Sequence, residues 1–137
     1  MNINLLFGAI ISFASLSAFA ALTPLPDSLN CNIAGDNLSC QTMPTGMMIA
    51  GNSYPPTAGV YNFKNYATLA DGIIYASYGI DNNADAGFKL GNNRFANYMV
   101  DVSKTVAENP NWTLDNIMNE YKCTAAAADC GVELTHP

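Results

Sequence analysis

The chain begins with an uncharged and mainly apolar stretch, residues 1–20, which ends in Ala18-Phe19-Ala20. An apolar core of roughly a dozen residues before a small-x-small motif is the pattern of a secretory signal peptide. A membrane-spanning helix needs about 20 apolar residues and is therefore disfavoured. We expect a signal peptide over residues 1–20 and a single mature domain over residues 21–137, with no stable membrane insertion after cleavage.

Residues 21–58 show no long hydrophobic period, because they are rich in proline, glycine, asparagine and serine. Proline lacks a backbone donor and prevents a long helix. One short apolar run, residues 47–50, stands between Gly46 and Gly51 and fits a strand. We therefore expect a loop-rich segment that contains at most a short extended piece.

The pattern changes at Gly59, where aromatic and β-branched residues become frequent. These residue types favour extended backbone, and Asp71-Gly72 is a typical hairpin turn. The spacing predicts a β-hairpin over residues 59–81, and its first half also fits one face of a helix. The second half is apolar on both alternating faces, which indicates a central strand.

Beyond Asn93 the apolar residues recur with the period of an amphipathic helix. The first set is Phe95, Tyr98, Met99, Val102 and Val106, followed by Asn109-Pro110 as a stop. The second set is Leu114, Ile117, Met118 and Tyr121, preceded by Thr113 as N-cap. Trp112 is expected to pack on Ile117 at the start of that helix. The pattern therefore predicts two helices over residues 93–122.

Strands followed by helices indicate an α+β fold. We predict a small antiparallel sheet of two to three strands, packed on one face by two C-terminal helices. The loop-rich N-terminal segment would be stapled to it by disulfides.

The cysteines, Cys31, Cys40, Cys123 and Cys130, all follow the predicted signal peptide. An even number in an exported chain indicates two disulfides. If the alanine run 125–128 continued a helix, Cys123 and Cys130 would lie about 10 Å apart, beyond the limit of about 7 Å between bridged Cα atoms. Four cysteines permit three pairings. These give either two local loops or two long loops that join the ends of the domain, and both arrangements stay open. The cysteine spacing does not fit a zinc site.

Charge narrows the range of partners. Eleven acidic residues against five basic ones give a net charge of −6. Such a chain repels phosphate backbones, so we expect no nucleic-acid binding. It also lacks a polybasic cluster that would hold it on an anionic membrane.

Few side chains suit catalysis. The one histidine, His136, is next to the C-terminus, and no serine stands in a hydrolase motif. Glycoside hydrolysis requires only two carboxylates, so a small carboxylate-dependent hydrolase is an alternative. We favour a non-catalytic protein and expect no cofactor.

Asp81, Asn83 and Asp85 place oxygen ligands at alternate positions, as calcium-binding loops do. The pattern then departs from an EF-hand, because the glycine falls one place late and Asn92 stands where that motif has glutamate. We retain these residues as metal candidates and interpret the segment as an ordinary polar loop without a metal.

Tyrosines concentrate in one segment, as Tyr54, Tyr61, Tyr66, Tyr75 and Tyr78. Tyrosine combines rigid apolar area with a polar tip and is typical of adaptable contact surfaces. The alternative is that most of them are half-buried sheet residues. We predict a bacterial exported protein, periplasmic or secreted, that binds a protein or glycan in the envelope or outside the cell. A structural envelope component is a further alternative.

Overall fold

The computed structural model describes residues 22–137, and the predicted signal peptide lies outside them. The main element is an eight-stranded sheet in which all pairs are antiparallel. Its strands are β1 (Ser28–Ala34), β2 (Asn37–Cys40), β3 (Met47–Asn52), β4 (Gly59–Ala70), β5 (Ile73–Ile80), β6 (Asn83–Asn92), β8 (Thr113–Asp115) and β9 (Glu120–Cys123). Their order is β2-β1-β4-β5-β6-β3, and β9 pairs with both β4 and β8.

The remaining elements are short. Strands β7 (Met99–Val100) and β10 (Leu134–Thr135) pair with each other. Helix α2 (Val102–Glu108) follows β7, and the 3-10 turns are η1 (Arg94–Ala96) and η2 (Ala127–Cys130). No helix within residues 22–137 is long and apolar enough to cross a membrane.

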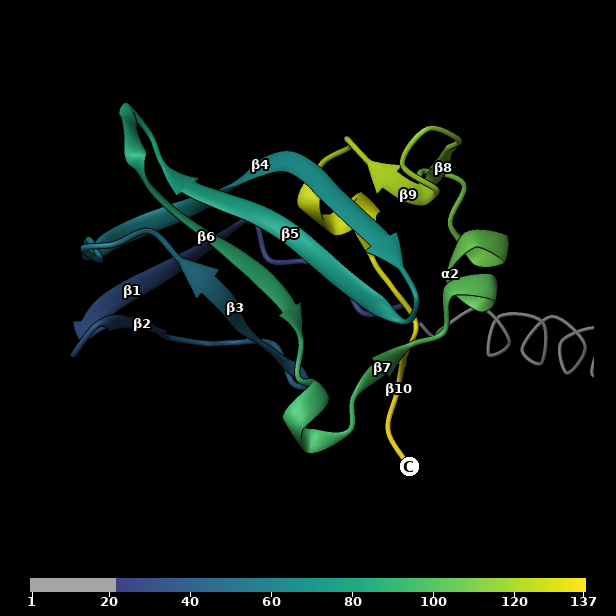
Figure 1. Ribbon diagram of the computed structural model, residues 1–137, viewed down its shortest axis with the longest axis horizontal. Coiled ribbons are helices and arrows are strands. Elements are labelled where there is room, and N and C mark those ends of the chain that lie inside the picture. Colours follow the sequence, from purple (N-terminus) through teal and green to yellow (C-terminus); the bar gives the residue numbers. More distant parts are fainter. Residues whose placement is uncertain (1–21) are drawn as a thin grey trace, which may run out of the picture.

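The sheet curls until its outer strands come near each other. Figure 1 shows β4, β5 and β6 as long curved strands, with β1, β2 and β3 folded back below them in this view. The side-chain amide nitrogen of Asn52, at the end of β3, lies 3.5 Å from the carbonyl oxygen of Asp36 in the β1–β2 turn. The sheet is therefore a nearly closed barrel around an apolar interior.

Alternate residues of the long strands fill this interior. Tyr61 points inward from β4, Tyr78 from β5 and Phe88 from β6, and all three are buried. The rings of Tyr78 and Phe88 stack with their centroids 5.0 Å apart. Tyr61 approaches the same Phe88 ring at 5.0 Å. Much of the aromatic content of residues 59–81 thus forms the core.

The hairpin predicted around Asp71-Gly72 is confirmed as the β4–β5 pair. Both turn residues have positive φ, 54° for Asp71 and 78° for Gly72. Such a pair of left-handed residues matches the twist of the two strands that it joins. The apolar run 47–50 is also extended, as part of β3.

The predicted α+β fold is wrong, because the domain is a large, nearly closed antiparallel sheet with a single α-helix among the described residues. Residues 21–58, expected to be loop-rich, contribute β1, β2 and β3. Leu29 and Cys31 are buried and alternate with exposed polar residues along β1. This short alternation is masked in the sequence by the turn residues around it.

Of the first predicted helix, residues 102–108 alone form an α-helix. The Asp101 carboxylate caps it by accepting a hydrogen bond of 3.0 Å from the backbone N–H of Lys104. The helix ends at Glu108, before Asn109-Pro110, as predicted. Met99, assigned to the same helical face, lies instead in β7.

The second predicted helix is instead the β8–β9 hairpin. Its turn is held by the Asp115 carboxylate, which accepts hydrogen bonds from the backbone N–H groups of Ile117 at 2.9 Å and Met118 at 3.2 Å. Ile117 is 93% exposed. The helical spacing of the apolar residues there does not mark a buried face.

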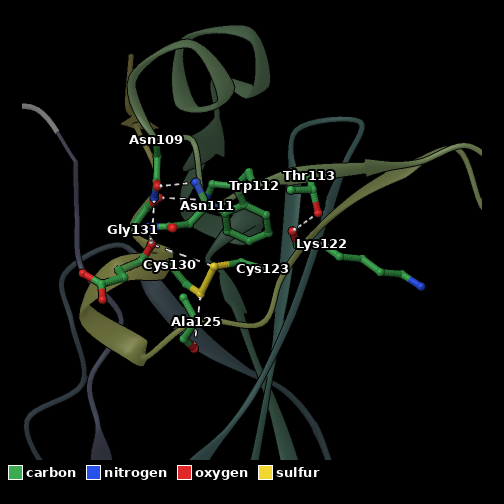
Figure 2. The surroundings of a disulfide bond; sticks show 10 residues. Asn109, Asn111, Trp112, Thr113, Lys122, Cys123, Ala125, Cys130 and Gly131 are labelled. Atoms are coloured by element: carbon green, nitrogen blue, oxygen red, sulfur yellow. Dashed lines mark hydrogen bonds between the residues drawn. A yellow bond between two sulfur atoms is a disulfide. The ribbon is translucent and has the colours of Figure 1, made fainter.

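Trp112 does not pack on Ile117, because it is 3% exposed and lies near the Cys123–Cys130 disulfide (Figure 2). Its indole N–H donates a hydrogen bond of 3.0 Å to the carbonyl oxygen of Gly131. The side-chain amide of Asn109 donates to the same oxygen at 3.1 Å. These contacts fix the C-terminal segment against the residues that follow α2.

The disulfides form the two local loops. Cys31 and Cys40 are register partners in the β1–β2 pair. Cys123 and Cys130 can pair because the alanine run is not a continuous helix, and their Cα atoms lie 5.8 Å apart. Two disulfides are consistent with an oxidising compartment, such as the periplasm or the extracellular space.

Candidate functional site

The outer face of the barrel carries a cluster of polar and small residues around Tyr75. Tyr75 lies in the middle of the sheet, with Thr68 of β4 and Gly91 of β6 as its register partners. It is 37% exposed, whereas its neighbours Ile74 and Ala76 in β5 are buried. The alternation of β5 therefore presents the Tyr75 ring to solvent at the centre of the sheet.

Three open hollows meet at Tyr75. The largest, about 470 Å³, extends toward β3 and is also lined by Gly51, Ser77 and Lys89. A second of about 330 Å³ lies toward β4 and includes Tyr66 and Thr68. The third, about 160 Å³, extends toward η1 and includes residues 94 and 95. The two larger volumes are at the lower end of the range of ligand-binding sites, roughly 300–1,000 Å³.

Small residues line two of these hollows beside the tyrosine ring. Gly91 stands directly opposite Tyr75. A Cβ atom at Gly91 would lie 3.0 Å from the carbonyl oxygen of Ile74, 3.4 Å from the Cβ atom of Ala50 and 3.7 Å from Cδ1 of Tyr75, so its neighbours already fill the space above this glycine. At Gly51 an added Cβ would meet no atom within 4 Å. We name this surface the Tyr75 face; its residues are Ala50, Gly51, Tyr66, Thr68, Tyr75, Ser77, Lys89, Gly91 and Arg94.

The Tyr75 face offers hydroxyl and ammonium groups next to its aromatic rings. The Lys89 ammonium donates a hydrogen bond of 2.5 Å to Oγ of Ser77. Beside the face, the Lys122 ammonium lies 5.7 Å from the centroid of the Tyr66 ring. Both lysines can therefore donate to a ligand that lies on the aromatic rings.

Lys122 is held by a charged partner in the β8–β9 hairpin. Its Nζ lies 2.6 Å from Oδ2 of Asp115. The hydrogen bond from Lys122, with further bonds from the backbone N–H groups of Met118 and Ile117, lowers the pKa of Asp115. The same carboxylate, followed by Tyr66, raises the pKa of Lys122. Both groups are charged at neutral pH.

The structure separates the five predicted tyrosines into three groups. Tyr66 and Tyr75 share the Tyr75 face. Tyr54 is 76% exposed, in the loop after β3. Tyr61 and Tyr78 are buried, and their hydroxyls donate hydrogen bonds of 2.6 Å to the carbonyl oxygens of Thr57 and Pro26. Burial raises the pKa of both buried hydroxyls.

The metal candidates lie around the β5–β6 turn. The Asp81 carboxylate is 2.8 Å from the Lys64 ammonium, and this hydrogen bond is the main cause of its lowered pKa. Oδ1 of Asn83 accepts a hydrogen bond of 3.2 Å from the backbone N–H of Asp85. Across residues 22–137, no group of three or more His, Cys, Asp or Glu side chains is arranged to hold a metal ion.

The remaining catalytic candidate, His136, stacks on Tyr98 with the ring centroids 4.1 Å apart. It is absent from the residues that line the three hollows at Tyr75.

Four residues of the Tyr75 face are not among those predicted from the sequence, namely Gly51, Lys89, Gly91 and Arg94. A signal was present for β6, where the buried residues Ala86, Phe88 and Leu90 alternate with Gly87 and Lys89. Such alternation of apolar with small or polar residues predicts a strand with one solvent-facing side. The partner of each residue on that side depends on strand order, which the pattern does not reveal.

Comparisons of the chain with protein-family models, with curated proteins and with solved structures found no match.

Proposed function

We propose that this chain is an exported, non-catalytic binding protein that recognises a glycan in the envelope or outside the cell. The observation that carries the proposal is the position of Tyr75, a partly exposed ring at the junction of three hollows on one face of the sheet. Aromatic rings and a small number of convergent polar groups in a concave surface are typical of ligand sites.

A glycan suits this surface better than a protein does. The face of a sugar ring carries C–H groups, which pack well on the electron-rich face of an aromatic side chain. Sugar hydroxyls can exchange hydrogen bonds with Thr68, Ser77 and Lys89, which line the hollow beside Tyr66. A stable protein interface needs about 800 Å² on each partner and large buried anchors. The aromatic side chains that line the three hollows and are not buried are Tyr66, Tyr75 and Phe95, and small or polar residues separate them.

Binding is favoured over hydrolysis by the carboxylates present. Glycosidases use two carboxyl groups about 5–10 Å apart. The residues that line the three hollows include one carboxylate, Asp85. A two-carboxylate mechanism therefore has no second acid at this site.

Export is supported by two independent features. The segment at residues 1–20 has the composition of a signal peptide. All four cysteines are paired, as thiols are in oxidising compartments. The proposed site of action is the periplasm or the medium.

The test is capture on a glycan library by the mature wild-type protein, Tyr75→Ala and Tyr54→Ala. Tyr54 is the matched control, because it is an exposed tyrosine outside the hollows. We expect Tyr75→Ala to lower the affinity for the captured glycan by at least about tenfold, and Tyr54→Ala to leave it unchanged. Far-ultraviolet circular dichroism checks that both variants are folded.

Two results would contradict the proposal. One is glycan capture that is equal in the wild type and Tyr75→Ala. The other is that no glycan is captured, while a protein is captured in a way that depends on Tyr75. The target of the Tyr75 face would then be a protein.

A further inference from the structure

The five cations of the chain differ in their pairing. Lys64, Lys104 and Lys122 each have a carboxylate oxygen within 4 Å, at 2.8, 3.7 and 2.6 Å respectively. Lys89 and Arg94 have no such partner among residues 22–137. Both are exposed, and both line hollows that include Tyr75. The two cations without a carboxylate partner thus belong to one face.

Lys89 and Arg94 lie on opposite sides of Tyr75 along the sheet. Gly91 is the register partner of Tyr75. Lys89 precedes Gly91 by two residues in β6, about 7 Å at the rise of a strand. Arg94 follows in η1, at the edge of the third hollow. A ligand whose ring lies on Tyr75 would therefore have one cation within reach on each side.

The acidic groups nearby do not cancel these two charges. Asp85 lines the largest hollow together with Lys89, but it lies four residues earlier in β6, about 13 Å away along the strand. Asp115 is neutralised by Lys122. Exposed charges act over a Debye length of about 8–10 Å in physiological salt. Among the residues that line the three hollows, two cations therefore stand against one carboxylate, although the whole chain has a net charge of −6.

We propose that the ligand of the Tyr75 face is a carboxylate-bearing polysaccharide, with a sugar ring on Tyr75 and its carboxylates paired with Lys89 and Arg94. This inference rests on the proposed function. Arginine binds a carboxylate with two parallel hydrogen bonds. Lys89 and Arg94 lie apart, on two sides of Tyr75. The carboxylates of such a polysaccharide likewise lie apart along its chain.

The test measures binding of the mature protein to polygalacturonate, alginate and hyaluronate by isothermal titration calorimetry. Each is compared with its carboxyl-reduced form, which keeps the chain and removes the charge. The variants are Lys89→Gln/Arg94→Gln, Tyr75→Ala, and Lys104→Gln as a cation control in α2. The wild type is expected to bind at least one carboxylated polymer at least about tenfold more tightly than its reduced form. The double variant should lose most of this preference, and Lys104→Gln should keep it.

Salt supplies a second readout. The wild-type affinity should fall as sodium chloride rises from about 0.05 to about 0.5 M, with a steeper slope than for the double variant. Dextran sulfate serves as a general polyanion, and its binding should not require Tyr75.

The outcomes separate the two proposals. Tyr75-dependent binding that is equal for neutral and carboxylated forms would overturn this inference and leave a neutral glycan as the ligand. Binding to all polyanions without dependence on Tyr75 would also overturn it. If Tyr75→Ala changes the capture of no member of the glycan library, the proposed function itself fails.

Discussion

Tyr75 and Gly91 are register partners in the β5–β6 pair, so the Tyr75 ring lies beside a residue that has no side chain. A Cβ atom at Gly91 would lie 3.7 Å from the ring and 3.0 Å from the carbonyl oxygen of Ile74. Gly91 is itself buried, because the Tyr75 ring and the side chain of Ala50 lie over it. Thr68, the partner on the other side, is small and polar. This arrangement makes the Tyr75 ring accessible at the centre of a sheet, where side chains usually cover each other.

Filling the largest of the three hollows at Tyr75 should block the ligand without loss of stability. Gly51 lines this hollow, and an added Cβ there meets no atom within 4 Å. We expect Gly51→Gln to lower glycan affinity by about tenfold and to change the free energy of unfolding by no more than about 0.5 kcal/mol. Ser39→Gln, in the exposed part of β2, is the control. Unchanged affinity in a folded Gly51→Gln protein would exclude this hollow from the site.

Trp112 should contribute to stability through its hydrogen bond and its burial. In Trp112→Phe the bond to the Gly131 carbonyl is lost, while Asn109 still satisfies that oxygen. We expect a loss of about 2 kcal/mol in the free energy of unfolding, mostly from the smaller side chain in a buried position. Urea denaturation followed by circular dichroism measures it. A Trp112→Phe protein as stable as the wild type would contradict the packing described for this region.

The Asp115–Lys122 pair should make stability depend on pH. The pKa of Asp115 is lowered in the folded state, so its contribution is present above the unfolded value and is lost as the pH falls through the folded one. The raised pKa of Lys122 means that its contribution is lost as the pH rises above about 10.5. Asp115→Asn keeps an oxygen acceptor for the turn and removes the charge.

We therefore expect Asp115→Asn to melt at a lower temperature than the wild type at pH 7. The difference should shrink as the pH falls below about 4. Thermal unfolding of both proteins over this range is the measurement. A constant difference at all pH values would show that the charge pair is not its cause.

The disulfide pairing should be visible directly. Proteolysis without reduction is expected to release one peptide pair linked through Cys31–Cys40 and another through Cys123–Cys130. Each double alanine variant should lose about 2–3 kcal/mol of stability, as small loops do in the chain-entropy model. Peptides that link an N-terminal to a C-terminal cysteine would contradict the fold at both ends.

The part of the fold that sequence predicts well is the β4–β5 hairpin. Its turn residues, Asp71 and Gly72, take the left-handed backbone that their types favour. β1 and β2 are not predicted by the pattern because each is short and has few buried positions. The β8–β9 hairpin resembles a helix in the sequence because its apolar residues are spaced helically, although Leu114, Ile117 and Met118 are exposed.

The site was predictable only in part. Tyr66 and Tyr75 were identified as candidates by composition, but the same reasoning included Tyr61 and Tyr78, which are buried. The side of the sheet that each tyrosine faces depends on register and on the irregularity in β4 between Phe63 and Ala67. Contacts across strands, such as Tyr75 with Gly91, are long-range and leave no local pattern.

The most direct test of the central claim is the set of backbone amide NMR shifts of the mature protein, titrated with the glycan that it captures from the library. Binding at the Tyr75 face predicts the largest changes at Thr68, Tyr75, Ser77, Lys89 and Gly91, with little change at Tyr54 or at the β8–β9 tip. Changes confined to the tip around Ile117, or to the loop of Tyr54, would contradict the claim and place the binding site elsewhere.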